Sequence, residues 1–438
     1  MDRDIFSTGG SLLVTDTLLD GRRVDIAVDD AGIIAGVVPA GTGEREFGGD
    51  RMVDGARTLA TPGLVNTHTH AAMTLLRGYA DDMLLQPWLS EKIWPLEAHL
   101  QSDDVYHGTR LACLEMIKSG TVAFNDMYFH MQDAARAVAE SGMRATLAHG
   151  FIDLGDPGKR DEEIRATERL IADIRAMDTP RIRSAVGPHG VYTVSAAGLE
   201  WCAETSAEEE IVFHIHLSET GTEVTDCLRD HGVRPAEWLD RHGCLSPRTV
   251  AAHCCWLDEA ECRLLGARGV HASYNPTSNM KLSVNRAMPY DELIRAGANV
   301  SLGTDGCASN NNLDILEEAK TAALLQKMWY NDPRRLPAPA ALEMAGPAGH
   351  RALGLPGGVI EPGRPADIVL VDLDTSCMTP CHHADSNLVY ACPGAAVKTT
   401  VCHGRVLMHE RVVPGEGEIL ESAARAADAL VRRAADAG

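Results

Sequence analysis

The run Thr67-His68-Thr69-His70, placed shortly after Pro62 and Gly63, constrains the fold more than any other stretch of this sequence. Residues i and i+2 of a β-strand point to the same side, so the two imidazoles would lie together. The upstream Pro and Gly interrupt the chain, so we expect a short strand that ends at the second histidine. Two adjacent imidazoles supply half of a tetrahedral shell for a zinc-class metal. A lone pair of this kind more often decorates an exposed strand end, so the interpretation depends on the rest of the chain.

Later apolar runs also end in polar residues. His216 closes one run and precedes Glu219, while His253 and Asp305 close two others. Catalytic groups occupy this C-terminal end of each strand in a parallel (β/α)8 barrel. Eight β-like runs alternate with helical segments such as residues 103–119 and 133–141, and they lie near residues 63–68, 121–126, 144–149, 182–187, 211–217, 249–254, 269–274 and 299–304. The sequence therefore predicts an α/β fold of the (β/α)8 TIM-like class.

Both ends of the chain are rich in β-like segments, unlike the middle. The expected strands lie at residues 11–15, 24–28, 32–38 and 366–372, followed by a hairpin over 397–413 that turns at His403-Gly404. Residues 418–435 read as an amphipathic helix that packs on the sandwich or on the barrel. We predict a composite β-sandwich domain with this helix, made of residues 1–60 and 359–438, and a catalytic barrel over residues 61–358.

The net charge and the distribution of apolar residues limit the kinds of partner that this protein is expected to bind. The net charge is −22, from 40 basic and 62 acidic residues, which argues against binding to nucleic acid or to an anionic membrane. No apolar run reaches the ~18 residues of a membrane span. The 12 cysteines are scattered, and no secretory signal pattern is present, so we expect reduced thiols and a cytoplasmic location. We expect a homo-oligomer that acts on a small molecule.

Several motifs together resemble one family. They are Pro62–His70, Trp94–Glu97, His216–Glu219, His253-Cys254, Asn275–Leu282 and Gly303–Gly306. With these motifs the chain resembles the amidohydrolase superfamily over nearly its whole length. Within it, the chain is similar to the branch of 5-methylthioadenosine/S-adenosylhomocysteine and 5′-deoxyadenosine deaminases.

The resemblance implies a metal site made of His68, His70, His216 and Asp305. Zinc is the expected ion, with ferrous iron as the alternative, and such an ion lowers the pKa of a bound water from about 15.7 to about 7. His214 competes with His216, because it faces the same way on the strand; the resemblance assigns the ligand to His216 and leaves His214 as a core or supporting group. The strand at 182–187 lacks the lysine that bridges two metals in some relatives, so we expect one metal per chain.

The resemblance also implies the catalytic roles. Glu219 would protonate a purine ring nitrogen, His253 would orient the attacking water, and Asp305 would serve both the metal and the reaction. Without the motifs, Glu219 would read as a solvated loop carboxylate, His253 as a buried histidine bonded to backbone, and Asp305 as a helix N-cap.

The substrate contacts are expected from Glu97, His189, Glu219 and Asp305, with Glu97 bound to ribose hydroxyls. The alternatives are a helix-surface glutamate at Glu97 and a packed turn at His189. Where relatives that handle S-adenosylhomocysteine carry an arginine, this chain has His149. Arg160, in a predicted loop over residues 153–161, could bind the carboxylate instead, or be an exposed loop residue.

The predicted function is metal-dependent hydrolytic deamination of adenine nucleosides, namely 5′-deoxyadenosine, 5-methylthioadenosine, S-adenosylhomocysteine and adenosine. The alternative is a chlorohydrolase, or a deaminase of another amino-heterocycle such as a guanine-like base or an s-triazine. A binding module without activity would have to keep the four ligands and Glu219 unused.

Overall fold

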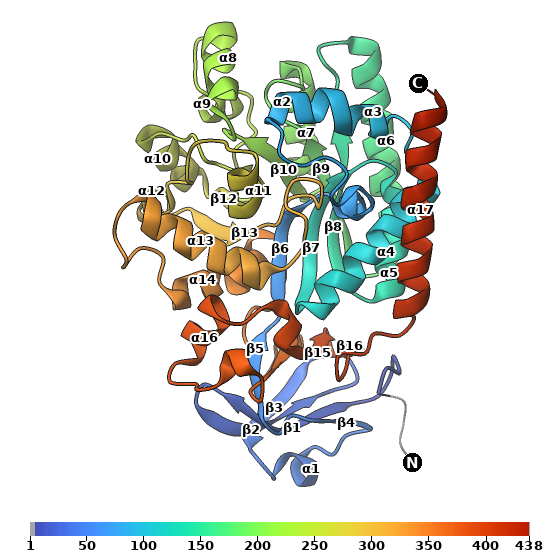
Figure 1. Cartoon of the computed structure of the whole chain (residues 1–438), viewed down its shortest axis with the longest axis vertical. Coiled ribbons are helices and arrows are strands. Elements are labelled where there is room, and N and C mark those ends of the chain that lie inside the picture. Colours follow the sequence, from blue (N-terminus) through green and yellow to red (C-terminus); the bar gives the residue numbers. More distant parts are fainter. Residues whose placement is uncertain (1–4, 438) are drawn as a thin grey trace.

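Eight parallel strands form a nearly closed barrel at the centre of the structure, which is a computed structural model that describes residues 5–437 (Figure 1). The strands follow one another around the sheet in sequence order. They are β6 (Leu64–Thr69), β7 (Thr121–Tyr128), β8 (Arg144–Phe151), β9 (Ile182–Pro188), β10 (Val212–Leu217), β11 (Thr249–His253), β12 (His271–Tyr274) and β13 (Asn299–Leu302). All eight predicted strands are confirmed within a few residues.

A few individual hydrogen bonds, rather than a regular ladder, join the last strand of the barrel to the first. The Asp305 N–H donates to the His68 carbonyl at 2.9 Å. The Thr67 hydroxyl donates to the Leu302 carbonyl at 2.8 Å, and the Asn66 amide to the Thr304 hydroxyl at 2.7 Å. The polar residues around the two histidines therefore also close the barrel, and this brings β6 and the loop after β13 together.

Helices cover the outside of the barrel, as a parallel sheet with apolar strands requires (Figure 1). They are α4 (Ser102–Lys118), α5 (Met131–Ser141), α6 (Pro157–Ala176), α7 (Ala196–Glu208), α8 (Gly221–His231), α9 (Pro235–Arg241), α10 (Glu259–Arg268), α11 (Pro276–Lys281), α12 (Tyr290–Arg295), α13 (Ile315–Trp329), α14 (Ala338–Ala345) and α15 (Pro347–Ala352). Between β6 and α4 the chain forms the short helical elements η1 (Ala71–Leu76), α2 (Leu85–Trp88), η2 (Leu89–Ile93) and α3 (Trp94–Glu97).

The predicted loop over residues 153–161 is wrong, because α6 already begins at Pro157. The Asp156 side chain caps this helix by accepting from the N–H groups of Gly158 and Lys159. Proline suits the first helical position, where its missing N–H is not needed. Arg160 therefore belongs to the first turn of a helix.

The second sheet is built from both ends of the chain, as predicted. Its order is β16-β15-β14-β5-β1-β2-β3, and β4 also pairs with β1. A separate apolar core lies within it, including Leu12, Ile26, Leu370 and Val401. The strands are β1 (Leu12–Leu19), β2 (Arg22–Val28), β3 (Ile34–Pro39), β4 (Arg51–Asp54), β5 (Thr58–Pro62), β14 (Ile368–Asp372), β15 (Val397–Cys402) and β16 (Arg405–Met408), with the helical segments α1 (Gly43–Glu46), η3 (Ser376–Met378), α16 (Ala384–Tyr390) and η4 (Gly394–Ala396).

A buried ion pair joins this sheet to the barrel. Arg144 at the start of β8 pairs with Asp367, and both side chains are at most 4% exposed. His350 lies 3.4 Å from the same carboxylate, which also accepts the His403 N–H at 2.9 Å. The two parts of the chain therefore share a charged junction that excludes water.

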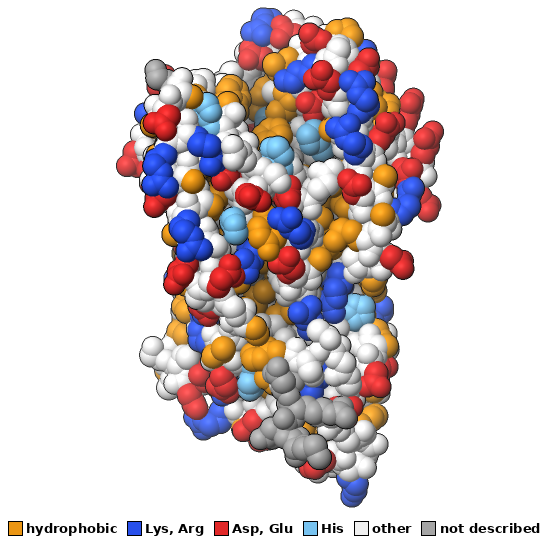
Figure 2. Space-filling view, turned by 90° about the vertical axis from the view of Figure 1, so that its right-hand side faces the viewer, with side chains coloured by type: hydrophobic (Ala, Val, Ile, Leu, Met, Phe, Trp, Pro, Cys, Tyr) orange, Lys and Arg blue, Asp and Glu red, His pale blue; other side chains and the backbone are white. Residues whose placement is uncertain are grey.

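The C-terminal helix α17 (Glu416–Ala437) packs along α4 of the barrel (Figure 1). Ion pairs join Lys118 to Glu416 at 2.6 Å and Arg110 to Glu418 at 2.5 Å. On the face of the molecule shown in Figure 2, acidic and basic side chains are interspersed. The division of the chain into a composite domain (residues 1–60 and 359–438) and a barrel (residues 61–358) stays a proposal. In that division α17 belongs to the composite domain, although it packs on α4 of the barrel. Among the described residues, no helix is both long and apolar enough to cross a membrane.

Candidate active site

Four side chains converge at the C-terminal ends of β6, β10 and β13. The Nε2 atoms of His68 and His70 each lie 3.3 Å from Asp305 Oδ1. His216 Nε2 lies 3.4 Å from His70 Nε2. The structure therefore brings together all four of the predicted metal ligands.

The other nitrogen of each ring is held by a neighbour. His70 Nδ1 donates to the Met127 carbonyl and His216 Nδ1 to the His189 carbonyl, both at 2.6 Å. His68 Nδ1 lies 2.8 Å from His214 Nε2. The two bonds to carbonyls fix the proton of His70 and of His216 on Nδ1 and leave their Nε2 lone pairs free for a metal. His214 is thus a supporting group that orients His68.

The two oxygens of the Asp305 carboxylate have different partners. Its Oδ1 faces the histidines and accepts the Gly306 N–H at 2.9 Å, while Oδ2 accepts the hydroxyls of Ser278 at 2.6 Å and Ser309 at 3.2 Å. Burial raises the pKa of Asp305, but the neighbouring histidines outweigh it and hold the pKa well below its usual range. The carboxylate is therefore charged and oriented. The serines had no assigned role in the sequence.

His253 faces the same cluster from the end of β11. Its Nδ1 accepts from Asn279 Nδ2 at 2.8 Å, with Asn275 Nδ2 at 3.3 Å. Cys255 Sγ donates to Asn279 Oδ1 at 3.2 Å, which is consistent with this amide orientation. Because Nδ1 is an acceptor, Nε2 carries the proton and is the atom that can donate toward the ligand cluster. Both asparagines lie in the sequence motif Asn275–Leu282, but the sequence did not indicate that they bind His253.

Glu219 lies beside the cluster, with Oε1 3.9 Å from His253 Nδ1. Burial, reinforced by the charge of Asp305, raises the pKa of Glu219 to about 8. Its carboxyl is therefore protonated near neutral pH and can act as an acid. Ser218, His253 and Asp305 have positive φ angles of 49°, 72° and 63°. Such strained backbone in non-glycine residues is typical of functional sites.

These residues open into a cavity of about 100 Å³ that is also lined by Trp88, Trp94, Glu97, Tyr128 and His189. Glu97 accepts the Tyr128 hydroxyl at 2.6 Å, and burial raises its pKa to about 7. Burial lowers the pKa of His189 to about 3, so this ring is neutral, and its Nδ1 lies 3.0 Å from the Thr193 hydroxyl. The structure thus places Glu97 and His189 in the same cavity as Glu219.

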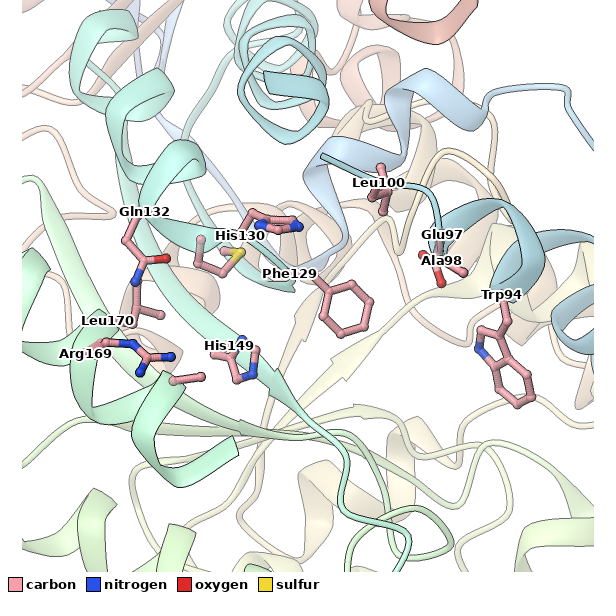
Figure 3. Close-up of a pocket in the computed structure, with 12 residues that line it drawn as sticks. Trp94, Glu97, Ala98, Leu100, Phe129, His130, Gln132, His149, Arg169 and Leu170 are labelled. Atoms are coloured by element: carbon pink, nitrogen blue, oxygen red, sulfur yellow. The ribbon is translucent and has the colours of Figure 1, made fainter. Parts of the chain in front are cut away.

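A second, outer cavity of about 540 Å³ adjoins the first and shares Trp94, Glu97 and Phe129 with it. Figure 3 shows Phe129 between the side that carries Glu97 and the side that carries His149 and Arg169. His149 lines this outer cavity, and its Nε2 lies 2.6 Å from Glu163 on α6. Arg160 is not among the lining residues of either cavity, whereas Arg169, also on α6, lines the outer one. The sequence singled out the first of these arginines and missed the second.

The ligand cluster fits a divalent metal. His68 Nε2 is fully buried and has no hydrogen-bond partner among the described residues. The ligand atoms of His68, His70 and His216 all lie within 4.8 Å of one another. Three imidazoles and one carboxylate are the donor set of a zinc-class site. A cation would satisfy the lone pairs that the protein leaves unpaired.

Comparisons with known proteins agree with this geometry. The model of the Amidohydrolase family matches residues 59–407. The chain is 60% identical to 5′-deoxyadenosine deaminase of Methanoregula boonei (98% of each chain), and 48% identical to 5-methylthioadenosine/S-adenosylhomocysteine deaminase 1 of Archaeoglobus fulgidus (85% of this chain, 87% of the relative). An adenosine deaminase from Xanthomonas campestris with bound zinc superposes with a TM-score of 0.91 at 35% identity, over 96% of this chain and 98% of that one. The chain belongs to the amidohydrolase family.

Proposed function

We propose that this protein catalyses the hydrolytic deamination of adenine nucleosides to inosine-type products and ammonia. The observation that carries the proposal is one cavity in which the buried carboxyl of Glu219 lies beside His70, His216 and Asp305 of the ligand cluster. Relatives that are 48–60% identical over most of the chain are named as deaminases of such nucleosides, which supports the same activity here.

The proposed cofactor is a single zinc ion per chain, held by His68, His70, His216 and Asp305. Two features support one metal. The two groups of possible ligand side chains, His68 with His70 and His216 and His68 with His253 and Asp305, share His68 and so form one cluster. In addition, β9 contains no lysine that could bridge a second ion. Zinc in a neighbour of the same fold supports the choice of ion, with ferrous iron as the alternative. In this reaction a bound divalent ion supplies Lewis-acid activation of the attacking water, lowering its pKa to about 7.

The residues of the chain would divide the remaining chemistry. His253 donates from Nε2 to the attacking water and so directs it at the amino-bearing ring carbon. Glu219 gives its proton to the adjacent ring nitrogen, which makes that carbon more electrophilic. Asp305 lies where it can accept the proton that water gives up and pass it to the departing amino group. The amino group then leaves as ammonia, the new hydroxyl on the ring carbon returns its proton to Glu219, and the ring becomes a hypoxanthine.

The cavity also suggests how the nucleoside lies. Glu97 would accept ribose hydroxyls and His189 would contact the base, with Glu219 and Asp305 at its reacting edge. We propose that the adjoining outer cavity takes the 5′ substituent. A carboxylate on that substituent would meet Arg169 or Arg160, because His149 is already bonded to Glu163. 5′-Deoxyadenosine, 5-methylthioadenosine and adenosine should therefore be substrates, and S-adenosylhomocysteine should depend on these arginines.

The test is a substrate panel with the purified, metal-loaded protein. Conversion of adenine to hypoxanthine changes the ultraviolet absorbance, and each of the four nucleosides can be followed this way. Guanine, an amino-s-triazine and a chloro-s-triazine form the comparison group. Turnover of the triazines or guanine without turnover of any adenine nucleoside would replace the proposal with the alternative function. The cytoplasmic location and the homo-oligomer stay predictions, and light scattering of the purified protein tests the second.

A further inference from the structure

The carboxylate of Glu223 holds the backbone from which Glu219 projects. Glu223 lies in the first turn of α8 and is 6% exposed. Its two oxygens accept the backbone N–H groups of Ser218 at 2.7 Å and of Glu219 at 2.8 Å. One buried carboxylate therefore binds two successive peptide groups, at the point where the chain leaves β10 for α8.

The turn that Glu223 binds has an unfavourable backbone conformation. Ser218 has a φ of 49°, and a non-glycine residue in this region costs on the order of 1–3 kcal/mol unless its surroundings fix it. The Ser218 hydroxyl is buried and has no hydrogen-bond partner among the described residues. The backbone carbonyl of Ser218 accepts the Trp256 N–H at 2.8 Å. The turn is thus held by Trp256 on one side and by Glu223 on the other.

The direction of the Glu219 side chain follows from this turn. The Glu219 carboxyl makes no hydrogen bond to another side chain of residues 5–437, and His253 Nδ1, at 3.9 Å from Glu219 Oε1, is too far to hold it. The backbone at Glu219 therefore decides where the carboxyl lies. A misplacement of about 1 Å can cost a catalytic group on the order of 100-fold in rate.

We propose that Glu223 is a positioning residue for proton transfer by Glu219. It touches neither the cavity nor the ligand cluster, and it acts through the two peptide groups that it binds. This inference rests on the proposed deamination, because it assumes the role of Glu219 as the acid.

The test begins with Glu223→Gln, which replaces one accepting oxygen by an NH₂ group that faces an N–H donor. We expect kcat on 5′-deoxyadenosine to fall by about 10–100-fold while KM changes by less than about 2-fold, with metal content retained. Asp25→Asn is the matched control. Asp25 is also buried, and in β2 of the terminal sheet it accepts the N–H groups of Asp16 at 2.8 Å, Gly41 at 2.9 Å and Gly43 at 2.8 Å. Its loss should lower the melting temperature and leave kcat unchanged.

A double-mutant cycle separates positioning from general stability. In a Glu219→Gln background, Glu223→Gln should have no further effect on kcat, because the group that it positions is gone. An equal fold-loss in both backgrounds, or a wild-type kcat for Glu223→Gln, would overturn the inference. If Glu223→Gln does not fold, Glu223→Asp enters the same cycle, since its shorter carboxylate reaches only one of the two amides. A wild-type protein that deaminates no adenine nucleoside would refute the proposed function itself, and this inference with it.

Discussion

Replacing Glu219 by Gln tests the chemistry with little change in structure. The two side chains have nearly the same shape, and the Glu219 carboxyl holds no other described side chain by a hydrogen bond. Its contact with His253 Nδ1, at 3.9 Å, is longer than a hydrogen bond, and His253 is neutral because burial lowers its pKa to about 4. The variant should therefore fold, keep its metal and bind substrate as the wild type does.

The expected loss is in the chemical step. The introduced glutamine side chain could still donate a hydrogen bond to the ring nitrogen but could not transfer a proton. General acid catalysis contributes about 10²–10⁴-fold, which equals about 2.7–5.4 kcal/mol at about 1.36 kcal/mol per tenfold. We expect kcat to fall by this factor with KM nearly unchanged.

The pH profile gives a second signature. Burial, with Asp305, raises the pKa of Glu219 to about 8, and the active form is the protonated one. Activity should therefore be present below this pKa and be lost as the pH rises through it. A divalent cation at the cluster favours the ionised form, so the alkaline limb should lie at or below about pH 8. Glu219→Gln should lack this limb.

The assay is steady-state deamination of 5′-deoxyadenosine from about pH 5.5 to about pH 9.5, a range that brackets the titration of Glu219, with metal content measured for each variant. Glu97→Gln is the control, because Glu97 is a second buried carboxyl in the same cavity that is proposed to bind ribose. It should raise KM, with kcat affected less. A Glu219→Gln protein with near wild-type kcat, or with the alkaline limb intact, would refute the assignment of Glu219 as the acid.

Three other substitutions probe different parts of the structure. His68→Ala should lower the metal content from one ion per chain to well below one and abolish turnover, as elemental analysis and the absorbance assay would show. Arg169→Ala should lower kcat/KM for S-adenosylhomocysteine and leave 5′-deoxyadenosine unaffected, while the same result with Arg160→Ala instead would return the tail contact to Arg160. Asp367→Asn should cost about 3–5 kcal/mol of unfolding free energy, because it leaves Arg144 buried and unpaired. Burial raises the pKa of Asp367, but His350 and Arg144 outweigh it and hold the pKa below its usual value. The contribution of Asp367 to stability is therefore present above about pH 4 and is lost as the pH falls further. Urea unfolding between about pH 3 and about pH 7 should show this acid dependence reduced in Asp367→Asn.

Local patterns in the chain were enough to predict the elements of the fold. Each barrel strand is a short apolar run, and each of these runs was found because parallel strands are buried on both faces and need apolar residues throughout. The metal ligands could be anticipated for a related reason. His68 and His70 are two residues apart where one strand ends, so their spacing alone places them together. A barrel brings the ends of other strands to the same rim, but the family resemblance selected His216 over His214 and assigned Asp305 to the site.

The contacts between elements came only from the tertiary structure. The Asn279 bond that sets the His253 tautomer, the Glu223 bond behind Glu219 and the pairing of His149 with Glu163 each join residues whose separation in the chain has no fixed period. They depend on where a helix begins and on how it is rotated against its strand. The position of α6 determines which arginine lines the outer cavity. Because α6 starts at Pro157, Arg160 lies in its first turn, and Arg169 rather than Arg160 lines that cavity. The sequence by itself determined the fold, since this follows from apolar patterns within short segments, and the resemblance to the amidohydrolases supplied the predicted metal ligands. Packing between segments decided how those residues are oriented and charged.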